Sequence, residues 1–94
     1  MSLDYTPERY RALRLAAAEL IVCDRTVLRR RDTVDLPPEV FAALLVLDRG
    51  GYLQHQLPEP DGDLAVRPVG LSLPGMQLLI SFNHAHFLRG PQSR

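Results

Sequence analysis

Apolar residues recur at helical spacing in three separate stretches of the chain. The first stretch starts at Thr6-Pro7-Glu8, where an N-cap residue, a proline and an acid form a helix start, and it is expected to run to about Cys23. The second spans residues 37–49 and ends at Gly50-Gly51, because a glycine readily adopts the left-handed conformation that ends a helix. The third follows the N-cap residue Ser72 and runs from residue 73 to about residue 88. The pattern therefore predicts three helices.

The large apolar side chains on one face of each expected helix are predicted to form the core. In order along the three helices, these positions are Tyr10, Leu13, Ala17, Leu20 and Ile21, then Val40, Phe41, Leu44, Leu45 and Leu47, then Met76, Leu79, Ile80 and Phe87 with Leu78 and Phe82 beside them. A chain of 94 residues that is 46% hydrophobic can bury one such core without a metal or a disulfide.

Between the helices the pattern changes to that of short strands. Residues 26–31 contain β-branched side chains without a helical stripe and predict a strand, although strand and helix both stay open for residues 24–35. Residues 52–56 and 64–67 predict two more strands, joined by an acidic turn that is too long for a tight hairpin and is expected to project as a mobile wing. We therefore expect one α+β domain over residues 1–94, with loose tails at 1–5 and 89–94.

The segments on either side of this turn resemble those of winged-helix proteins. Residues 47–53 read LDRGGYL and residues 69–79 read VGLSLPGMQLL, which is similar to the helix end and the next helix start of winged-helix bacterial regulators. The chain also resembles small phage-type winged-helix proteins in which a strand replaces the usual middle helix. The resemblance covers about half of the chain. It implies a winged-helix-like fold of three helices and a small antiparallel sheet with a β-hairpin wing.

Charge and cysteine content narrow the classes of function. The formal net charge is zero, so the overall charge gives no reason to expect binding to nucleic acid or to an anionic membrane. Cys23 is the single cysteine, which allows no disulfide within the chain and fits a reducing compartment. Because neither a signal peptide nor an apolar run long enough to span a bilayer is visible, we expect a cytoplasmic protein without a membrane partner.

Residues that could carry chemistry are few. His84 and His86 are two apart, so on a helix they point away from each other, and even with His55 they lack the spacing of a metal site. The paired acids lie in loops or turns, where turn chemistry explains them. The glycines form neither a dinucleotide fingerprint nor a Walker motif, and no nucleophile elbow is present. We therefore expect no enzymatic activity, no metal, no cofactor and no small-molecule substrate.

The helix at residues 37–49 carries the surface that favours a protein partner. Its outward positions are expected to be Glu39, Ala42, Ala43, Val46 and Arg49. Small and apolar side chains make poor contacts with phosphates or base edges, and the acids at positions 59, 61 and 63 of the wing would repel a phosphate backbone. We therefore predict a non-catalytic protein-binding module that regulates or inhibits a larger partner, as phage-encoded inhibitors do, or that binds a second copy.

The alternative is a dimeric DNA-binding winged-helix regulator. It would use Arg29, Arg30, Arg31 and Arg67 to contact phosphates. On a strand, Arg29 and Arg31 would share one face and Arg30 would take the other. The same cluster is also explained as charge that protects an edge strand from pairing with another chain, and we favour this second interpretation.

Overall fold

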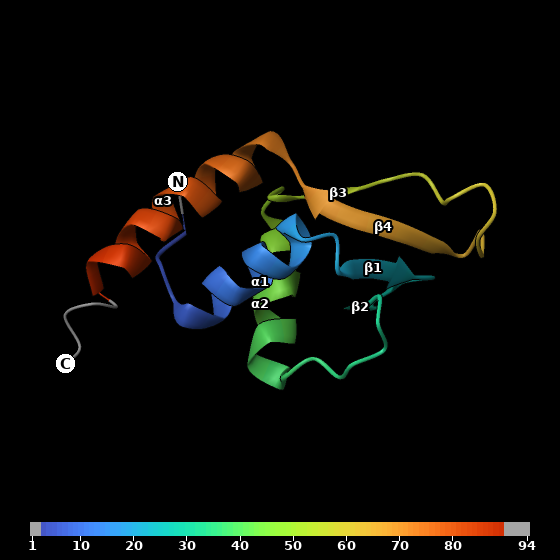
Figure 1. Cartoon of the computed structure of the whole chain (residues 1–94), viewed down its shortest axis with the longest axis horizontal. Helices are drawn as coiled ribbons and strands as arrows, with labels where there is room; N and C mark the ends of the chain where they lie inside the picture. The colour runs from blue at the N-terminus through green and yellow to red at the C-terminus, as the bar shows by residue number, and fades with distance from the viewer. Residues whose placement is uncertain (1–2, 90–94) are drawn as a thin grey trace.

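The computed structural model of the chain describes residues 3–89 and is shown in Figure 1. Within these residues the chain forms three helices and one four-stranded antiparallel sheet, an α+β fold. In chain order the elements are α1 (Pro7–Ala17), β1 (Ile21–Asp24), β2 (Val27–Arg30), α2 (Pro38–Arg49), β3 (Leu53–His55), β4 (Val66–Leu71) and α3 (Leu73–Arg89). Helix α1 packs against both α2 and α3, and the long β3–β4 connection extends away from the helices (Figure 1).

The strand order in the sheet is β2-β1-β4-β3, so β1 and β4 lie in the centre and β2 and β3 form the edges. Cys23 of β1 lies opposite Leu28 of β2 on one side and opposite Arg67 of β4 on the other. Side chains alternate between the two faces of a sheet, and the face that carries Ile21 and Cys23 contributes to the hydrophobic core. Val22 is also buried, but it lies on the opposite face of the sheet, outside that core.

The core is built where α1 and α2 cross the sheet. The helical residues that are almost fully buried are Ala12, Leu13 and Ala16 of α1 and Val40, Leu44 and Leu47 of α2. In α2 these positions recur at the spacing of one helical face, which is the pattern that the sequence predicts. Fully burying a leucine or valine side chain contributes about 1.5–3 kcal/mol, so this face accounts for the position of α2 in the fold.

The first helix ends at Ala17 and not near Cys23, so the sequence-based prediction is wrong at this point. The amide of Leu20 donates to the carbonyl of Leu15 across 3.0 Å, and Glu19 adopts a positive φ of 62°. This is the left-handed helix end that glycine usually supplies, and the absence of a glycine here removed the sequence signal. Residues 21–24 form β1 instead, a central strand whose continuous apolar run reads equally well as a buried helix.

The other predicted elements are present with shifted limits, and the strands expected at residues 52–56 and 64–67 are β3 and β4. The strand expected at residues 26–31 is β2, which also settles residues 27–30 as strand. The second helix ends with Gly51 at a φ of +84°, as the glycine pair predicts. Ser72 is the N-cap of α3, because its hydroxyl accepts a hydrogen bond from the amide of Gly75 across 3.2 Å.

Helix α3 presents a different face to the core than the sequence predicts. Leu78 and Phe82 are buried, whereas Met76, Ile80 and Phe87 are exposed. The prediction is wrong because α3 carries apolar side chains on two opposite sides, so its periodicity does not identify the side that packs against α1.

The structure describes only part of the loose tails expected at residues 1–5 and 89–94. Leu3 and Tyr5 pack against the core, and Arg89 belongs to α3. Residues 1–2 and 90–94 lie outside the described residues.

Candidate protein-binding surface

Helix α2 has an exposed face opposite the side that it buries against the core. The residues of this surface, called the α2 face, are Glu39, Ala42, Leu45, Val46 and Arg49. Leu45 and Val46 are 41% and 40% exposed. The centre of the α2 face is therefore apolar, with an acid in the first turn of the helix and an arginine in the last. Both charges have the sign that the helix dipole favours at their end of the helix.

The α2 face differs from the sequence-based expectation at two positions. Ala43 was expected to point outward but is buried, because it lies one helical turn from Val40 and Leu47 and so joins the core side of the helix. The other four expected positions are exposed. Leu45 was expected in the core but is exposed, because the side of α2 that packs on the core consists of Val40, Ala43, Leu44 and Leu47. The hydrophobic pattern could not identify Leu45 as a surface residue, because nearly every position in this helix is apolar.

Leu45 also lines a hollow of about 510 Å³ between α2 and the sheet. The walls include Arg25, Asp48, His55, Leu64 and Arg67, with Cys23 at the inner end. Nε2 of His55 lies 2.8 Å from Oδ1 of Asp48, a contact that ties β3 to the end of α2. Burial raises the pKa of the Cys23 thiol, and the nearby carboxylate of Asp48 raises it further. A thiol with a raised pKa is a poor nucleophile, so the hollow lacks an activated group of that kind.

Three of the four arginines expected to contact nucleic acid are engaged by acids of the same chain. Arg29 lies 3.2 Å from Asp24, Arg30 makes two hydrogen bonds of 2.9 and 2.6 Å to Asp32, and Arg31 lies 3.1 Å from Glu59. The hydrogen bonds from Arg30 lower the pKa of the Asp32 carboxyl. Each of these guanidinium groups therefore has an anionic neighbour in the same chain, which offsets part of the positive charge that a phosphate would meet.

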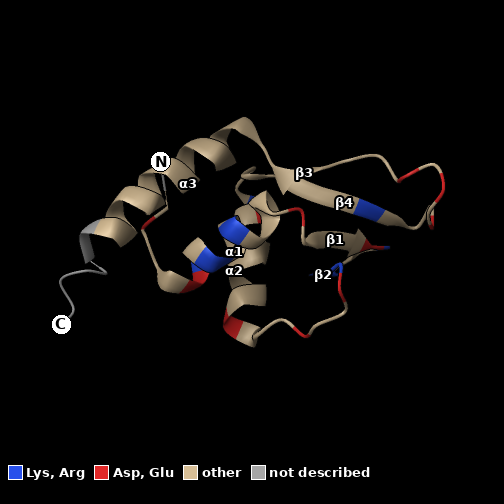
Figure 2. Cartoon of the chain, in the orientation of Figure 1, with Lys and Arg blue, Asp and Glu red and all other residues tan. Residues whose placement is uncertain are grey.

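The basic residues are also divided between the two faces of the sheet. The register of β1 and β2 places Arg29 on the face of Val22 and Arg30 on the face of Ile21, as the alternation predicts. Arg67 lies on β4, and its neighbours across the sheet place it on the same face as Cys23. Figure 2 shows basic and acidic positions on both the helices and the sheet, and acidic positions in the connection between β3 and β4. Strand β2 is an edge strand, which agrees with a protective role for its charges.

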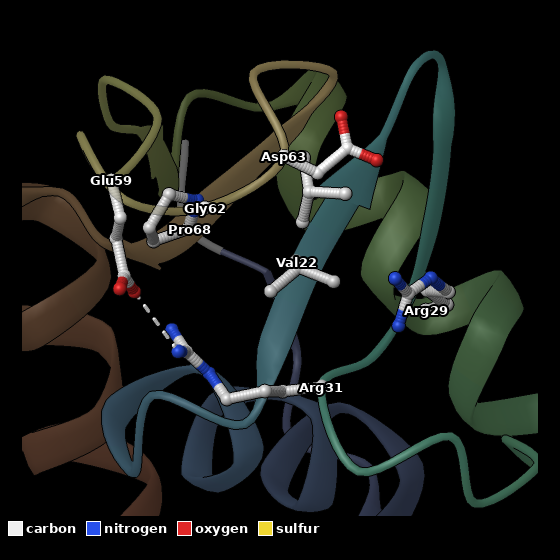
Figure 3. A pocket seen from close by; sticks show the side chains of 8 residues that line it. Val22, Arg29, Arg31, Glu59, Gly62, Asp63 and Pro68 are labelled. Atoms are coloured by element: carbon white, nitrogen blue, oxygen red, sulfur yellow. Dashed lines mark hydrogen bonds and ion pairs between the residues drawn. The ribbon is translucent and has the colours of Figure 1, made fainter.

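A smaller hollow of about 240 Å³ lies on the outer face of the sheet (Figure 3). Val22 and Pro68 form an apolar floor, with arginines on one side and the β3–β4 connection on the other. The ion pair of Arg31 with Glu59 closes one side, and the amide of Gly62 donates to the carbonyl of Glu59 across 3.1 Å. The connection thus folds back over the sheet and covers Val22. The mixture of charges around this hollow does not resemble an anion cradle.

The three histidines are dispersed in the structure. His86 stacks on Tyr10 with a centroid distance of 4.5 Å, while His84 is exposed and His55 lies at the sheet edge. Among residues 3–89, no group of three or more His, Cys, Asp or Glu residues is arranged to hold a metal ion.

The described part of the chain also contains no helix of the length and apolar character needed to cross a membrane. Large exposed apolar side chains lie on α3, in the β3–β4 connection, at Val27 and Val34, and on α2, where Leu45 and Val46 are the least exposed of this group. Comparisons with protein-family models, with curated proteins and with solved structures found no match.

Proposed function

We propose that this chain is a winged-helix-like, non-catalytic protein-binding module that regulates or inhibits a larger partner through the α2 face. The arrangement of the sheet supports the fold assignment. Strand β1 pairs with β4, and β3 and β4 form the hairpin that follows α2. This is the relation between the first strand, the recognition helix and the wing in a winged-helix domain. Strand β2 lies between the first strand and α2, the part of the chain in which such a domain is expected to have its middle helix.

The observation that carries the functional proposal is the exposure of Leu45 and Val46 beside Ala42 on α2. Apolar side chains in a contiguous exposed group mark an interaction site more often than scattered ones do. The central apolar group has charged neighbours at both ends of the helix, which is the composition of an interface with an apolar centre and a polar rim. The partner that fits this surface is another polypeptide with an apolar groove or patch.

DNA binding is the weaker proposal for the same helix. A reader of the major groove would present donors and acceptors to base edges and cations to phosphates. The α2 face offers Arg49 and the acid Glu39, separated by apolar side chains. The three arginines at the end of β2 have acidic partners, and the wing that would approach the DNA backbone contains three acids.

The proposal is tested by affinity capture with the full chain as bait in a lysate of its native cells. The variants are Val46→Glu, which places a charge in the centre of the α2 face, and Leu57→Glu, which places the same charge at an exposed position in the β3–β4 connection. We expect one protein to be retained by the wild type and by Leu57→Glu and to be lost with Val46→Glu. Circular dichroism of both variants checks that they are folded. Equal retention by the two variants would contradict a role for the α2 face, as would a wild-type bait that retains nothing.

A further inference from the structure

Helix α3 is apolar on two opposite sides, and the rest of the described chain covers one of them. Leu78 and Phe82 are buried on the covered side. The residues of the uncovered side, called the α3 stripe, are Leu73, Met76, Ile80, His84 and Phe87. The four apolar members are between 50% and 70% exposed. Successive residues of an α-helix are turned by about 100° around its axis. On this basis all members of the α3 stripe lie within about 40° of Ile80, whereas Leu78 and Phe82 lie about 160° from Ile80.

The α3 stripe has the same spacing when it is read from either end. Met76 and His84 lie four residues before and after Ile80, and Leu73 and Phe87 lie seven residues before and after it. Two antiparallel copies that cross at Ile80 would therefore bring the two Ile80 side chains together. Each Leu73 would face Phe87 of the other copy. Such self-complementarity is the requirement for an interface with two-fold symmetry, in which the same surface is used by both chains.

The absence of charged side chains on most of α3 also permits two copies to pair. The sequence contains no Asp, Glu, Lys or Arg from residue 73 to residue 88. Two such helices can therefore pair without bringing like charges together. A partner recognised by charge would find no complementary group along the stripe, in contrast to the α2 face with Glu39 and Arg49.

We propose that two copies of this chain pair through the α3 stripe as an antiparallel, two-fold symmetric helix pair. The helix is about 25 Å long at about 1.5 Å per residue. One pair of helices of this length buries less than the roughly 800 Å² per partner of a standard interface, so the dimer dissociates on dilution. Since α3 and α2 are separate surfaces, dimerisation and partner capture through the α2 face can fail independently.

Sedimentation equilibrium of the full chain tests the dimer. The wild type is expected to approach twice the mass of one 10.6 kDa chain at high concentration and to return to 10.6 kDa on dilution. Ile80→Glu brings two carboxylates together at the centre of the stripe and is expected to remain at 10.6 kDa. Leu57→Glu, with the same charge on an exposed residue away from α3, is expected to behave as the wild type. A monomeric wild type up to about 1 mM, or a dimer that Ile80→Glu leaves unchanged, would overturn the proposal.

The antiparallel direction has its own test in a Cys23→Ala background, which removes the native thiol. Chains with Leu73→Cys are mixed with chains that carry Phe87→Cys and are then oxidised. We expect the mixture to form a disulfide-linked pair on a non-reducing gel, and Leu73→Cys chains alone to remain uncrosslinked. Efficient crosslinking of Leu73→Cys chains to one another would show parallel pairing and contradict the proposed arrangement.

Discussion

The hydroxyl of Tyr10 donates a hydrogen bond to Oδ1 of Asn83 across 2.7 Å, and this bond joins α1 to α3. The ring of Tyr10 also stacks on His86, and Tyr5 packs edge-on against Phe82 with a centroid distance of 5.3 Å. The start of the chain therefore holds the covered side of α3 in place and leaves the α3 stripe on the outside. These contacts of Tyr5 and Tyr10 add to the burial of Leu78 and Phe82 in holding α3 against the core.

Tyr10→Phe removes the hydrogen bond to Asn83 and keeps the ring. We expect the free energy of unfolding to fall by about 0.5–1 kcal/mol, because Asn83 is exposed and water can replace the lost donor. Tyr10→Ala removes the ring as well and should cost about 3 kcal/mol. Urea unfolding followed by circular dichroism measures both values. Equal losses for the two variants would mean that the ring contacts contribute nothing.

Gly75→Ala is expected to disturb the first turn of α3. A Cβ at this position would overlap the backbone carbonyl of Tyr52, which also accepts a hydrogen bond from the amide of Ser72 across 3.1 Å. Because backbone cannot move aside as a flexible side chain does, we expect a loss of about 1–3 kcal/mol in thermal or urea unfolding.

Gly62→Ala is the matched control for this substitution. A Cβ at Gly62 would approach Glu59 no closer than 3.7 Å, an ordinary contact, and its φ is not in the left-handed region. The control should therefore be as stable as the wild type or slightly more so. A Gly75→Ala protein with unchanged stability would show that α3 does not start in close contact with Tyr52.

Cys23 is expected to react slowly with a thiol reagent while the chain is folded. Burial raises the pKa of the thiol, and the thiolate is the reactive form. The raised pKa stabilises the folded state below the unfolded pKa of the thiol, and this contribution declines as the pH rises through the folded pKa. Labelling at pH 8 should therefore be much slower in buffer than in 8 M urea. Similar rates in both solutions would place the thiol at the surface.

Random duplex DNA should not bind to the chain even at low ionic strength. The three arginines near the end of β2 are paired with acids, and the wing carries three acids of its own. Fluorescence anisotropy of a labelled duplex over a salt series measures this. Binding with a steep salt dependence that Arg30→Glu removes would favour the DNA-binding alternative, since released counterions give such a slope.

The elements that were predicted correctly from the sequence have residues at both ends that favour the start or the end of that element. Helix α2 starts at a proline and ends at a glycine with positive φ, and its buried side follows the helical period. The β3–β4 connection is marked by its prolines and by Asp61-Gly62. Where prolines and glycines set the backbone conformation locally, the sequence was sufficient to predict the element.

The predictions failed where the hydrophobic pattern fits two structures equally well and tertiary contacts decide which of them forms. The run from Ile21 to Cys23 is apolar at every position, and only its pairing with β2 and β4 makes it a strand. In α3 both sides are apolar, so the sequence period does not distinguish them, and the structure buries the side that carries Leu78 and Phe82. The exposure of Leu45, and with it the full extent of the α2 face, has the same origin, because most of α2 is apolar.

Photocrosslinking from the α2 face in native cells tests the proposed function most directly. A photoreactive amino acid replaces Val46 in one version of the chain and Leu57 in another, so that both report from exposed positions. We predict a crosslink from position 46 to one larger polypeptide, and no such product from position 57. A crosslink to nucleic acid at position 46, or the same products from both positions, would contradict the assignment of the α2 face as a protein-binding surface.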